Sequence, residues 1–163
     1  RDVLVFLNDH LDRLWESAAA VGMTFPFTRN ELVEEVWKTL NENNMHDDVH
    51  VRIMITRGIK KTPSQDPRLT ISGPNLVILP EYKKASTESK EKGITLFTST
   101  IRRGSPDYLD PRLNCHSKLH EVQALIQAIE AGADEALMLD VHGFVSTCNA
   151  TNFFIIKPHY KTY

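Results

Sequence analysis

The chain has 163 residues, and its content of 41% hydrophobic and 25% charged residues is ordinary for a globular protein with one core or two small lobes. Its 19 basic and 21 acidic residues nearly cancel, which leaves no electrostatic footprint for nucleic acid or an acidic membrane, so we expect a small molecule or another protein as partner. Cys115 and Cys148 cannot build a disulfide scaffold, and there is no secretory segment or long apolar run, so the expected location is the cytoplasm or an organelle matrix.

The beginning of the chain is predicted to form a strand and then a helix. The apolar run at residues 3–7 is typical of a strand, and apolar residues then recur at helical spacing. Asn8 or Asp9 is the expected N-cap of this helix, and Gly22 is the expected residue just past its end.

A second helix is predicted to begin after Thr28. Thr28 and Glu31 have the spacing of a capping box, and Phe27 and Leu32 occupy the positions of a hydrophobic staple. The apolar residues that follow at helical spacing define the expected buried face: Leu32, Val33, Val36, Trp37 and Leu40.

The middle of the chain is predicted to contain two strands, at residues 49–57 and 75–82. The Pro- and Gly-rich segment between them is a long loop, which we expect to be either functional or mobile. The charged run at residues 83–93 is predicted to be a solvated loop.

The last part of the chain is predicted to mix strands with one helix. A strand at residues 94–100 and an irregular connector lead to a helix over residues 117–131. After the helix we predict a strand, a two-residue turn and two more strands, at 135–141, His142-Gly143, 144–146 and 152–157. The chain as a whole is therefore predicted to have an α+β fold.

Lys118 lies where the helix over residues 117–131 begins, within the edges of its apolar face. That face is expected to consist of Leu119, Val122, Leu125, Ile126 and Ile129, so Lys118 should point inward. A lysine at a helix end can instead bend its ammonium back to water. The alternative is a reactive amine, because the helix dipole and partial burial both favour the neutral form that attacks carbonyl carbons. On spacing alone, the solvated lysine is the stronger interpretation.

A metal site is another interpretation of the same segment. His116 and His120 are four residues apart and could supply two zinc ligands, with Cys115 and Glu121 adjacent. No third ligand has a recognisable spacing, and the glutamate is not where an H-E-x-x-H helix places it. We therefore expect no metal.

The segment GADEALMLDVHGFVSTCNATNFFII, at residues 132–156, resembles the class IV aminotransferases. This fold-type IV pyridoxal-phosphate family includes branched-chain and D-amino-acid aminotransferases and aminodeoxychorismate lyase. Upstream, VFLNDHLDRLWESAAAVGM resembles the family's H-x-x-R-L helix, and VRIMITRG resembles its arginine-bearing strand. The order and spacing of these pieces agree over nearly the whole chain.

The resemblance implies a two-lobed fold-type IV structure, of which this chain would be an incomplete part. Residues 1–93 would belong to the N-terminal lobe, residues 94–112 to a strand and interdomain connector, and residues 113–163 to the start of the C-terminal lobe.

The resemblance also implies roles for two arginines. Arg13 matches the arginine that holds the cofactor phosphate, a role that suits the planar fork of guanidinium donors. Arg52 falls near a position that lines the substrate side in some members. The alternation along its strand leaves open whether it points there or forms a cross-strand ion pair.

Two positions depart from the family pattern. Thr147 stands where the family has a glutamate that bonds the pyridine nitrogen; a hydroxyl can hydrogen-bond this nitrogen but cannot stabilise its positive charge as a carboxylate does. The family's Schiff-base lysine lies 18 residues before the glycine of GADEA, and this position holds Asn114. Lys118 is one helical turn later, and we expect it to replace the usual lysine.

The function implied by the resemblance is that of a pyridoxal-phosphate-dependent aminotransferase of the branched-chain or D-amino-acid type. Lys118 would hold the cofactor as an aldimine while an amino group passes between amino-acid and 2-oxo-acid substrates, and the protein would be a homodimer. Because Asn114 and Thr147 depart from the pattern, two alternatives stay open: a degenerate homologue that binds or dimerises without catalysis, and a pyridoxal-phosphate lyase or racemase.

Overall fold

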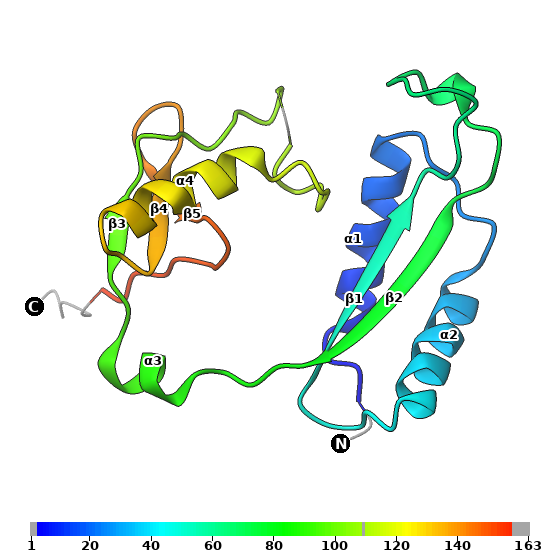
Figure 1. The fold of residues 1–163 in the computed structure, drawn as a ribbon, viewed down its shortest axis with the longest axis horizontal. Helices are drawn as coiled ribbons and strands as arrows, with labels where there is room; N and C mark the ends of the chain where they lie inside the picture. The colour runs from blue at the N-terminus through cyan, green and yellow to red at the C-terminus, as the bar shows by residue number, and fades with distance from the viewer. Residues whose placement is uncertain (1–2, 109, 158–163) are drawn as a thin grey trace, which may run out of the picture. The chain divides into compact units, whose positions relative to one another are not determined.

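A computed structural model describes residues 3–108 and 110–157 of the chain, which divides into two compact units (Figure 1). The first unit extends to Ala85 and also takes in Arg112–Asn114. The second consists of Ser86–Pro111 and the chain from Cys115 onward. None of the helices in the described residues has the length and apolar character needed to cross a bilayer.

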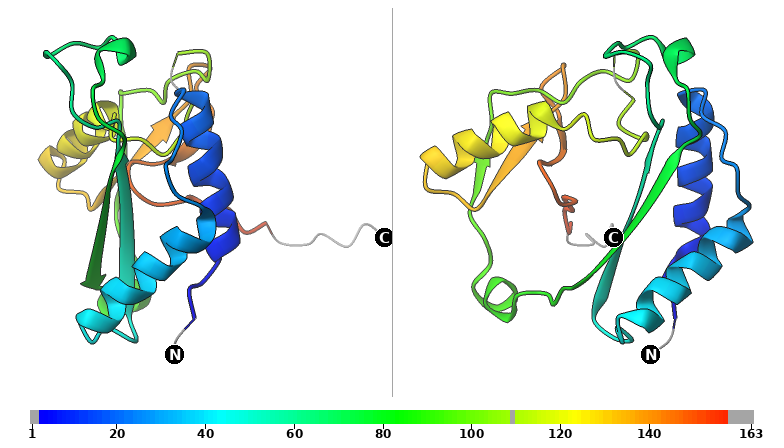
Figure 2. Two further views of the ribbon diagram at one scale, coloured as in Figure 1. Left: turned by 90° about the vertical axis from the view of Figure 1, so that its right-hand side faces the viewer. Right: turned by 45° about the vertical axis from the view of Figure 1, so that its right-hand side comes forward.

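The first unit contains two helices and a two-stranded antiparallel sheet. The elements are α1 (Leu7–Ala20), α2 (Arg29–Glu42), β1 (Val49–Thr56) and β2 (Asn75–Tyr82). The strands pair from Val49 opposite Tyr82 to Thr56 opposite Asn75. Both helices lie on the same side of the β1–β2 hairpin (Figure 2). The strands predicted at 49–57 and 75–82 and the two predicted helices are confirmed.

The start of α1 differs from the prediction. The expected strand at residues 3–7 is absent, because Phe6 takes a left-handed conformation with a φ of 53° and Leu7 already begins the helix. Phe6 is the N-cap and supplies no side-chain cap, so neither Asn8 nor Asp9 caps the helix. The end of α1 agrees with the prediction, since Gly22 has a φ of 61°.

The turn between α1 and α2 is held by an aromatic cluster. Trp15 meets Phe25 edge to face with ring centroids 4.9 Å apart, and Phe25 stacks on Phe27 at 5.3 Å. The guanidinium of Arg29 lies over the Trp15 ring and also pairs with Asp12. These contacts fix the position at which α2 begins.

The predicted capping box is present at the start of α2. The Thr28 hydroxyl accepts from the Glu31 amide at 3.3 Å, and the Glu31 carboxylate accepts from the Thr28 amide at 2.6 Å. Leu32, Val36 and Leu40 are buried as expected. With Met45, the last two of these residues pack against one face of the hairpin, formed by Val49, Val51, Ile53 and Ile78.

The segment between β1 and β2 has more structure than a plain loop. It contains a 3₁₀ turn at Pro67–Leu69 and a bridge between Lys60 and Thr70. Gly58 has a φ of 100°, and a Cβ atom there would lie 2.3 Å from the Gly73 carbonyl oxygen. Only glycine therefore allows the two ends of this segment to approach each other.

The second unit contains a three-stranded sheet in the order β3-β4-β5. Its elements are α3 (Thr87–Lys92), β3 (Leu96–Thr98), α4 (Leu119–Glu130), β4 (Glu135–Leu139) and β5 (Val145–Cys148). β3 and β4 are parallel, whereas β4 and β5 are antiparallel. The core consists of small side chains around one methionine: Ala124, Ala128, Ala136 and Met138.

Two secondary-structure predictions for this unit are wrong. The charged run 83–93 contains the short helix α3, because Ser86 accepts from the Ser89 amide and Lys92 pairs with Glu88 one turn away. The predicted strand at residues 152–157 is irregular. In addition, β5 runs to Cys148 rather than ending at residue 146.

The buried face of α4 is also not the predicted one. Its buried residues are Glu121, Ala124 and Ala128, whereas Leu119 is 72% exposed and Ile129 is 62% exposed. Val122 and Ile126 are exposed as well. Alanines let the helix backbone lie close to the sheet. A prediction that assigns the largest apolar side chains to the buried face does not detect this. Contrary to the prediction, Lys118 is therefore not within the buried face.

Replacing Thr28 with Ala is expected to lower the free energy of unfolding by about 1 kcal/mol, because the Glu31 amide loses its side-chain acceptor. Denaturant-induced unfolding measures the change. The matched control is Thr39→Ala in the last turn of α2, where the hydroxyl donates to the Glu35 carbonyl. The control should change stability by less than about 0.5 kcal/mol, and equal losses in the two variants would contradict the role of the cap.

Candidate active site

The parallel pairing of β3 with β4 decides where the start of α4 lies. Parallel neighbours require a crossover, and α4 provides it, ending at Glu130 just before β4 begins at Glu135. The first turn of α4 therefore lies toward the carboxyl edge of the two strands. In α/β units this edge is the usual place for ligands. Lys118, the N-cap of α4, is positioned there by the backbone.

The Lys118 amine lies beside a buried carboxylate. Its Nζ is 3.4 Å from Oε1 of Glu121, and the Lys118 side chain is 45% exposed, compared with 7% for Glu121. The sequence pointed to the helix dipole and to burial as influences on Lys118, but not to this carboxylate. Asn114, which occupies the family's usual lysine position, is exposed.

Two more basic groups approach the same carboxylate. Nη1 of Arg103 is 3.5 Å from Oε1 of Glu121, and Nδ1 of His120 is 3.1 Å from Oε2. The Arg103 amide donates to the Leu139 carbonyl at 2.8 Å, which places this arginine at the carboxyl end of β4. We call Glu121, Arg103, Lys118 and His120 the Glu121 cluster. Sequence reasoning missed it, although a glutamate three residues after a lysine at a helix start was a usable signal.

Thr147 lies on β5 opposite Met138 of β4. Its hydroxyl donates to the Thr151 carbonyl at 3.0 Å. To donate to a ring nitrogen instead, the hydroxyl would have to leave this carbonyl.

The turn that leads from β4 into β5 is held by Asp140. Its Oδ1 accepts from the backbone amides of Phe144 and His142, each at 2.9 Å. These amides, with Phe144 contributing most, hold the pKa of the Asp140 carboxyl below its usual range. The carboxylate therefore fixes the start of the strand that carries Thr147.

Arg13 lies on the exposed side of α1. Its Nη2 is 3.4 Å from Nδ1 of His10, one turn earlier, so the two named residues of the H-x-x-R-L motif are in contact. Within residues 3–108 and 110–157, no carboxylate pairs with Arg13. Most of its guanidinium donors are thus available to an anion.

Arg52 lies on the face of the hairpin opposite to α2. It is exposed and stands across from Leu79, next to the cross-strand pair of His50 and Glu81, whose Nδ1 and Oε1 are 3.0 Å apart. The His50 hydrogen bond, and to a smaller extent the charge of Arg52, lower the pKa of the Glu81 carboxyl. The cross-strand ion pair considered for Arg52 is therefore made by His50, and Arg52 makes none with the described residues.

The part of the chain that the structure describes contains no group of three or more His, Cys, Asp or Glu side chains arranged for a metal ion. His120 approaches Glu121 in the cluster described above, and His116 is exposed.

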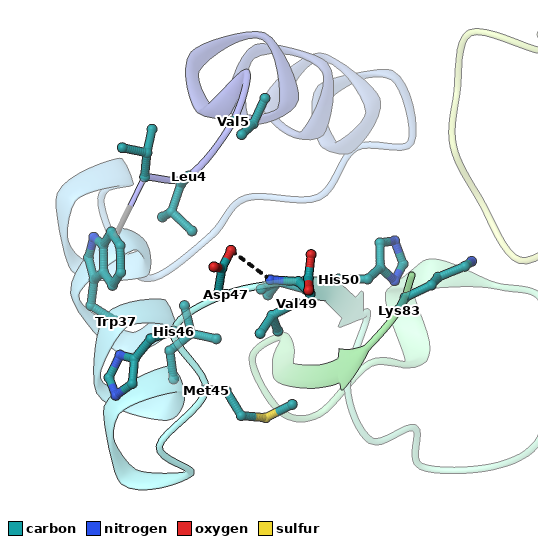
Figure 3. A pocket seen from close by; sticks show the side chains of 13 residues that line it. Leu4, Val5, Trp37, Met45, His46, Asp47, Val49, His50 and Lys83 are labelled. Carbon is teal, nitrogen blue, oxygen red and sulfur yellow. Dashed lines mark hydrogen bonds between the residues drawn. The ribbon is translucent and has the colours of Figure 1, made fainter. Parts of the chain in front are cut away.

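A cavity of about 480 Å³ lies elsewhere in the first unit (Figure 3). It is bounded by Leu4 and Val5, by Trp37 near the end of α2, and by the start of β1. His46, Asp47 and Lys83 are among its polar lining residues. Neither Arg13 nor Arg52 lines this cavity, so it is separate from the predicted site.

Solved structures that share this fold include branched-chain amino acid aminotransferases and a putative 4-amino-4-deoxychorismate lyase. The branched-chain amino acid aminotransferase of T.th., solved with pyridoxamine 5'-phosphate, matches with a TM-score of 0.77 and 24% identity over 88% of this chain and 46% of that one. The branched-chain amino acid aminotransferase of Escherichia coli matches with a TM-score of 0.68 and 21% identity, covering 88% and 47%. These similarities show the fold and confirm the prediction that a fold-type IV structure is present in part.

The sequence comparison extends this to the family. The sequence model described as Amino-transferase class IV matches residues 1–159. The chain belongs to the class IV aminotransferase family, as its motifs implied.

The chain matches only part of its curated relatives. It is 40% identical over 151 residues to branched-chain-amino-acid aminotransferase-like protein 2 of Arabidopsis thaliana, covering 93% of this chain and 27% of that protein. It is 32% identical over 156 residues to branched-chain-amino-acid aminotransferase of Pseudomonas aeruginosa, covering 93% and 49%. The chain thus spans between a quarter and a half of the length of these relatives.

The Asp140 carboxyl is expected to titrate below pH 3.9, the approximate value for an unperturbed aspartate. Because its pKa is lowered in the folded chain, the carboxylate stabilises the turn above this pH, and the contribution is lost as the pH falls through the folded-state pKa. The side-chain ¹³C shift of Asp140, followed by NMR, gives the midpoint. A midpoint at or above that of the same aspartate in the unfolded chain would contradict the hydrogen-bonded turn.

Proposed function

We propose that the whole protein is a pyridoxal-phosphate-dependent aminotransferase that moves an amino group between branched-chain amino acids and 2-oxo acids. The observation that carries this proposal is the placement of Lys118 at the carboxyl edge of β3 and β4, in a chain of the class IV aminotransferase family. The names of the relatives in Arabidopsis thaliana and Pseudomonas aeruginosa support the branched-chain substrate.

Of the three functional groups of the cofactor considered, the aldehyde and the phosphate have suitable partners among the residues present, and the ring nitrogen has a weaker one. Pyridoxal phosphate needs an amine for its aldehyde and a fork of donors for its phosphate, and Lys118 and Arg13 offer these. The partner of the ring nitrogen is weaker, since the Thr147 hydroxyl already donates to the Thr151 carbonyl. When bound, the cofactor supplies the electron sink for amino-group transfer.

The chain's own residues would then divide the work. Arg13 binds the phosphate through its guanidinium, which also orients the ring. Lys118 would hold the cofactor through Nζ, and the same atom, when free, would accept the Cα proton of the substrate. Arg52, exposed on the open face of the hairpin, recognises the carboxylate of the substrate. Thr147 contacts the ring nitrogen.

The resemblance to the family further leads us to propose a homodimer in the cytoplasm or an organelle matrix.

A second candidate function is that of a degenerate homologue that binds or dimerises without catalysis. Asn114 at the usual lysine position and the occupied hydroxyl of Thr147 favour it. A lyase or racemase is a further alternative within the same cofactor chemistry. These candidates differ from the leading one in whether a defined lysine captures the cofactor and in which product forms.

Reductive trapping separates these functions. The whole protein is mixed with pyridoxal phosphate, reduced with borohydride and mapped by peptide mass spectrometry. We expect one label per chain, at Lys118. The label should remain in the Asn114→Ala variant and should be lost in the Lys118→Ala variant. Lys92→Ala is the matched control, because Lys92 is an exposed lysine paired with Glu88 on another helix. A label at a different lysine would contradict the assignment, and no stoichiometric label would favour the degenerate homologue.

Replacing Arg13 with Ala is expected to weaken pyridoxal-phosphate binding roughly 10- to 100-fold, the loss of one or two charge-assisted hydrogen bonds. Arg13→Lys should recover only part of this affinity, since an ammonium lacks the planar fork. Equilibrium dialysis of the whole protein measures the change. Arg68→Ala, at an arginine with an 87% exposed side chain, is the control and should bind normally. Unchanged affinity in Arg13→Ala would remove Arg13 from the site.

A further inference from the structure

The Glu121 cluster contains a buried charge that the family motifs do not explain. The Glu121 side chain is almost fully buried in the first turn of α4, between a charged N-cap and two buried alanines. A carboxylate removed from water is unfavourable unless opposite charges or hydrogen bonds compensate for it. The groups around Glu121 must therefore compensate for the buried charge of its carboxylate.

Three basic side chains approach this carboxylate, two from the start of α4 and one from the segment after β3. Arg103 follows β3, Lys118 is the N-cap of α4, and His120 lies in the first turn of α4. Oε2 is buried and accepts no hydrogen bond from the described residues. The 3.1 Å approach of His120 is thus an ion-pair contact without hydrogen-bond alignment, available when the ring is protonated.

Lys118 and Arg103 share a single oxygen. Their nitrogens lie 3.4 Å and 3.5 Å from Oε1 of Glu121. Because Arg103 is tied to β4 through the Leu139 carbonyl, it fixes the carboxylate with respect to the sheet. The carboxylate in turn restrains the lysine, whose four-carbon side chain is otherwise free to move. The two cations also compete for the same negative charge.

We propose that Glu121 is a positioning residue that holds the Lys118 amine at the carboxyl edge of β3 and β4, and that Arg103 controls the strength of this hold by sharing Oε1. The purpose of this arrangement rests on the proposed function, since a fixed amine matters only if the amine reacts. The ion-pair geometry itself is independent of any cofactor and is tested without one.

Trace acetylation of the whole protein with acetic anhydride, in the absence of cofactor, measures how available the Lys118 amine is. Mass spectrometry compares Lys118 with Lys92 as an internal reference. In Glu121→Gln we expect Lys118 to be acetylated roughly two- to fivefold faster at a given pH, because a partly exposed ion pair that holds the amine is lost. Glu121→Asp keeps the charge on a shorter side chain and should give an intermediate rate. Glu130→Gln, at the other end of α4, is the matched control and should change nothing.

Arg103→Gln distinguishes positioning from general loosening of the structure. Without Arg103, the Glu121 carboxylate has one fewer cation to share, so it should hold Lys118 more tightly and slow its acetylation. A loosened helix start would instead speed acetylation in both Arg103→Gln and Glu121→Gln. Opposite changes in these two variants are the expected result, and changes in the same direction, or none, would overturn the proposal.

The remaining outcomes separate the positioning role from the proposed function. If circular dichroism shows that Glu121→Gln does not fold, the rates in Glu121→Asp and Arg103→Gln decide, with the same expected directions. If pyridoxal phosphate is captured by another lysine, the proposed function fails, whereas the acetylation rates still test the ion pair. If capture occurs at Lys118 but the acetylation rates do not change, Glu121 has no positioning role.

Discussion

The parallel pairing of β3 with β4 is the constraint on which the candidate site depends. Two adjacent parallel strands cannot be joined by a tight turn, so α4 must cross over and begin at their carboxyl edge. This geometry brings Lys118 and Arg103 to one place, although 14 residues lie between them in the sequence. It also explains the alanines at positions 124 and 128, because a short crossover helix must lie close to the strands it joins. The position of the Lys118 amine thus follows from the topology rather than from any property of the lysine.

Much of the first unit could be predicted from the sequence because its signals are local. The capping box at Thr28, the two strands of the hairpin and the glycine after α1 each depend on a few neighbouring residues. The errors arise where the outcome depends on partners. The apolar run at residues 3–7 suits a strand, but the left-handed Phe6 ends it. Residues 152–157 alternate little and pair with nothing in the described chain.

For the site, sequence motifs supplied candidate residues but not their surroundings. Arg13 and Lys118 came from motif order and spacing, whereas periodicity placed the buried face of α4 on its large side chains. The structure buries the alanines and Glu121 instead. The sequence analysis considered Glu121 only as a neighbour of the two histidines of a metal site, because the sequence does not show which cations lie near it. The hydrogen bond from the Arg103 amide to the Leu139 carbonyl brings Arg103 to Glu121, a contact that the sequence does not show. The two departures from the family pattern, Asn114 and Thr147, are unaffected by this and still distinguish the chain from the usual pattern.

The central claim is that the carboxyl edge of β3 and β4 is where the whole protein holds pyridoxal phosphate. A crystal structure of the whole protein grown with the cofactor tests this most directly. The account predicts continuous electron density from Nζ of Lys118 to the cofactor, with the phosphate against the Arg13 guanidinium. Density that joins the cofactor to another lysine, or a cofactor bound away from the start of α4, would contradict it.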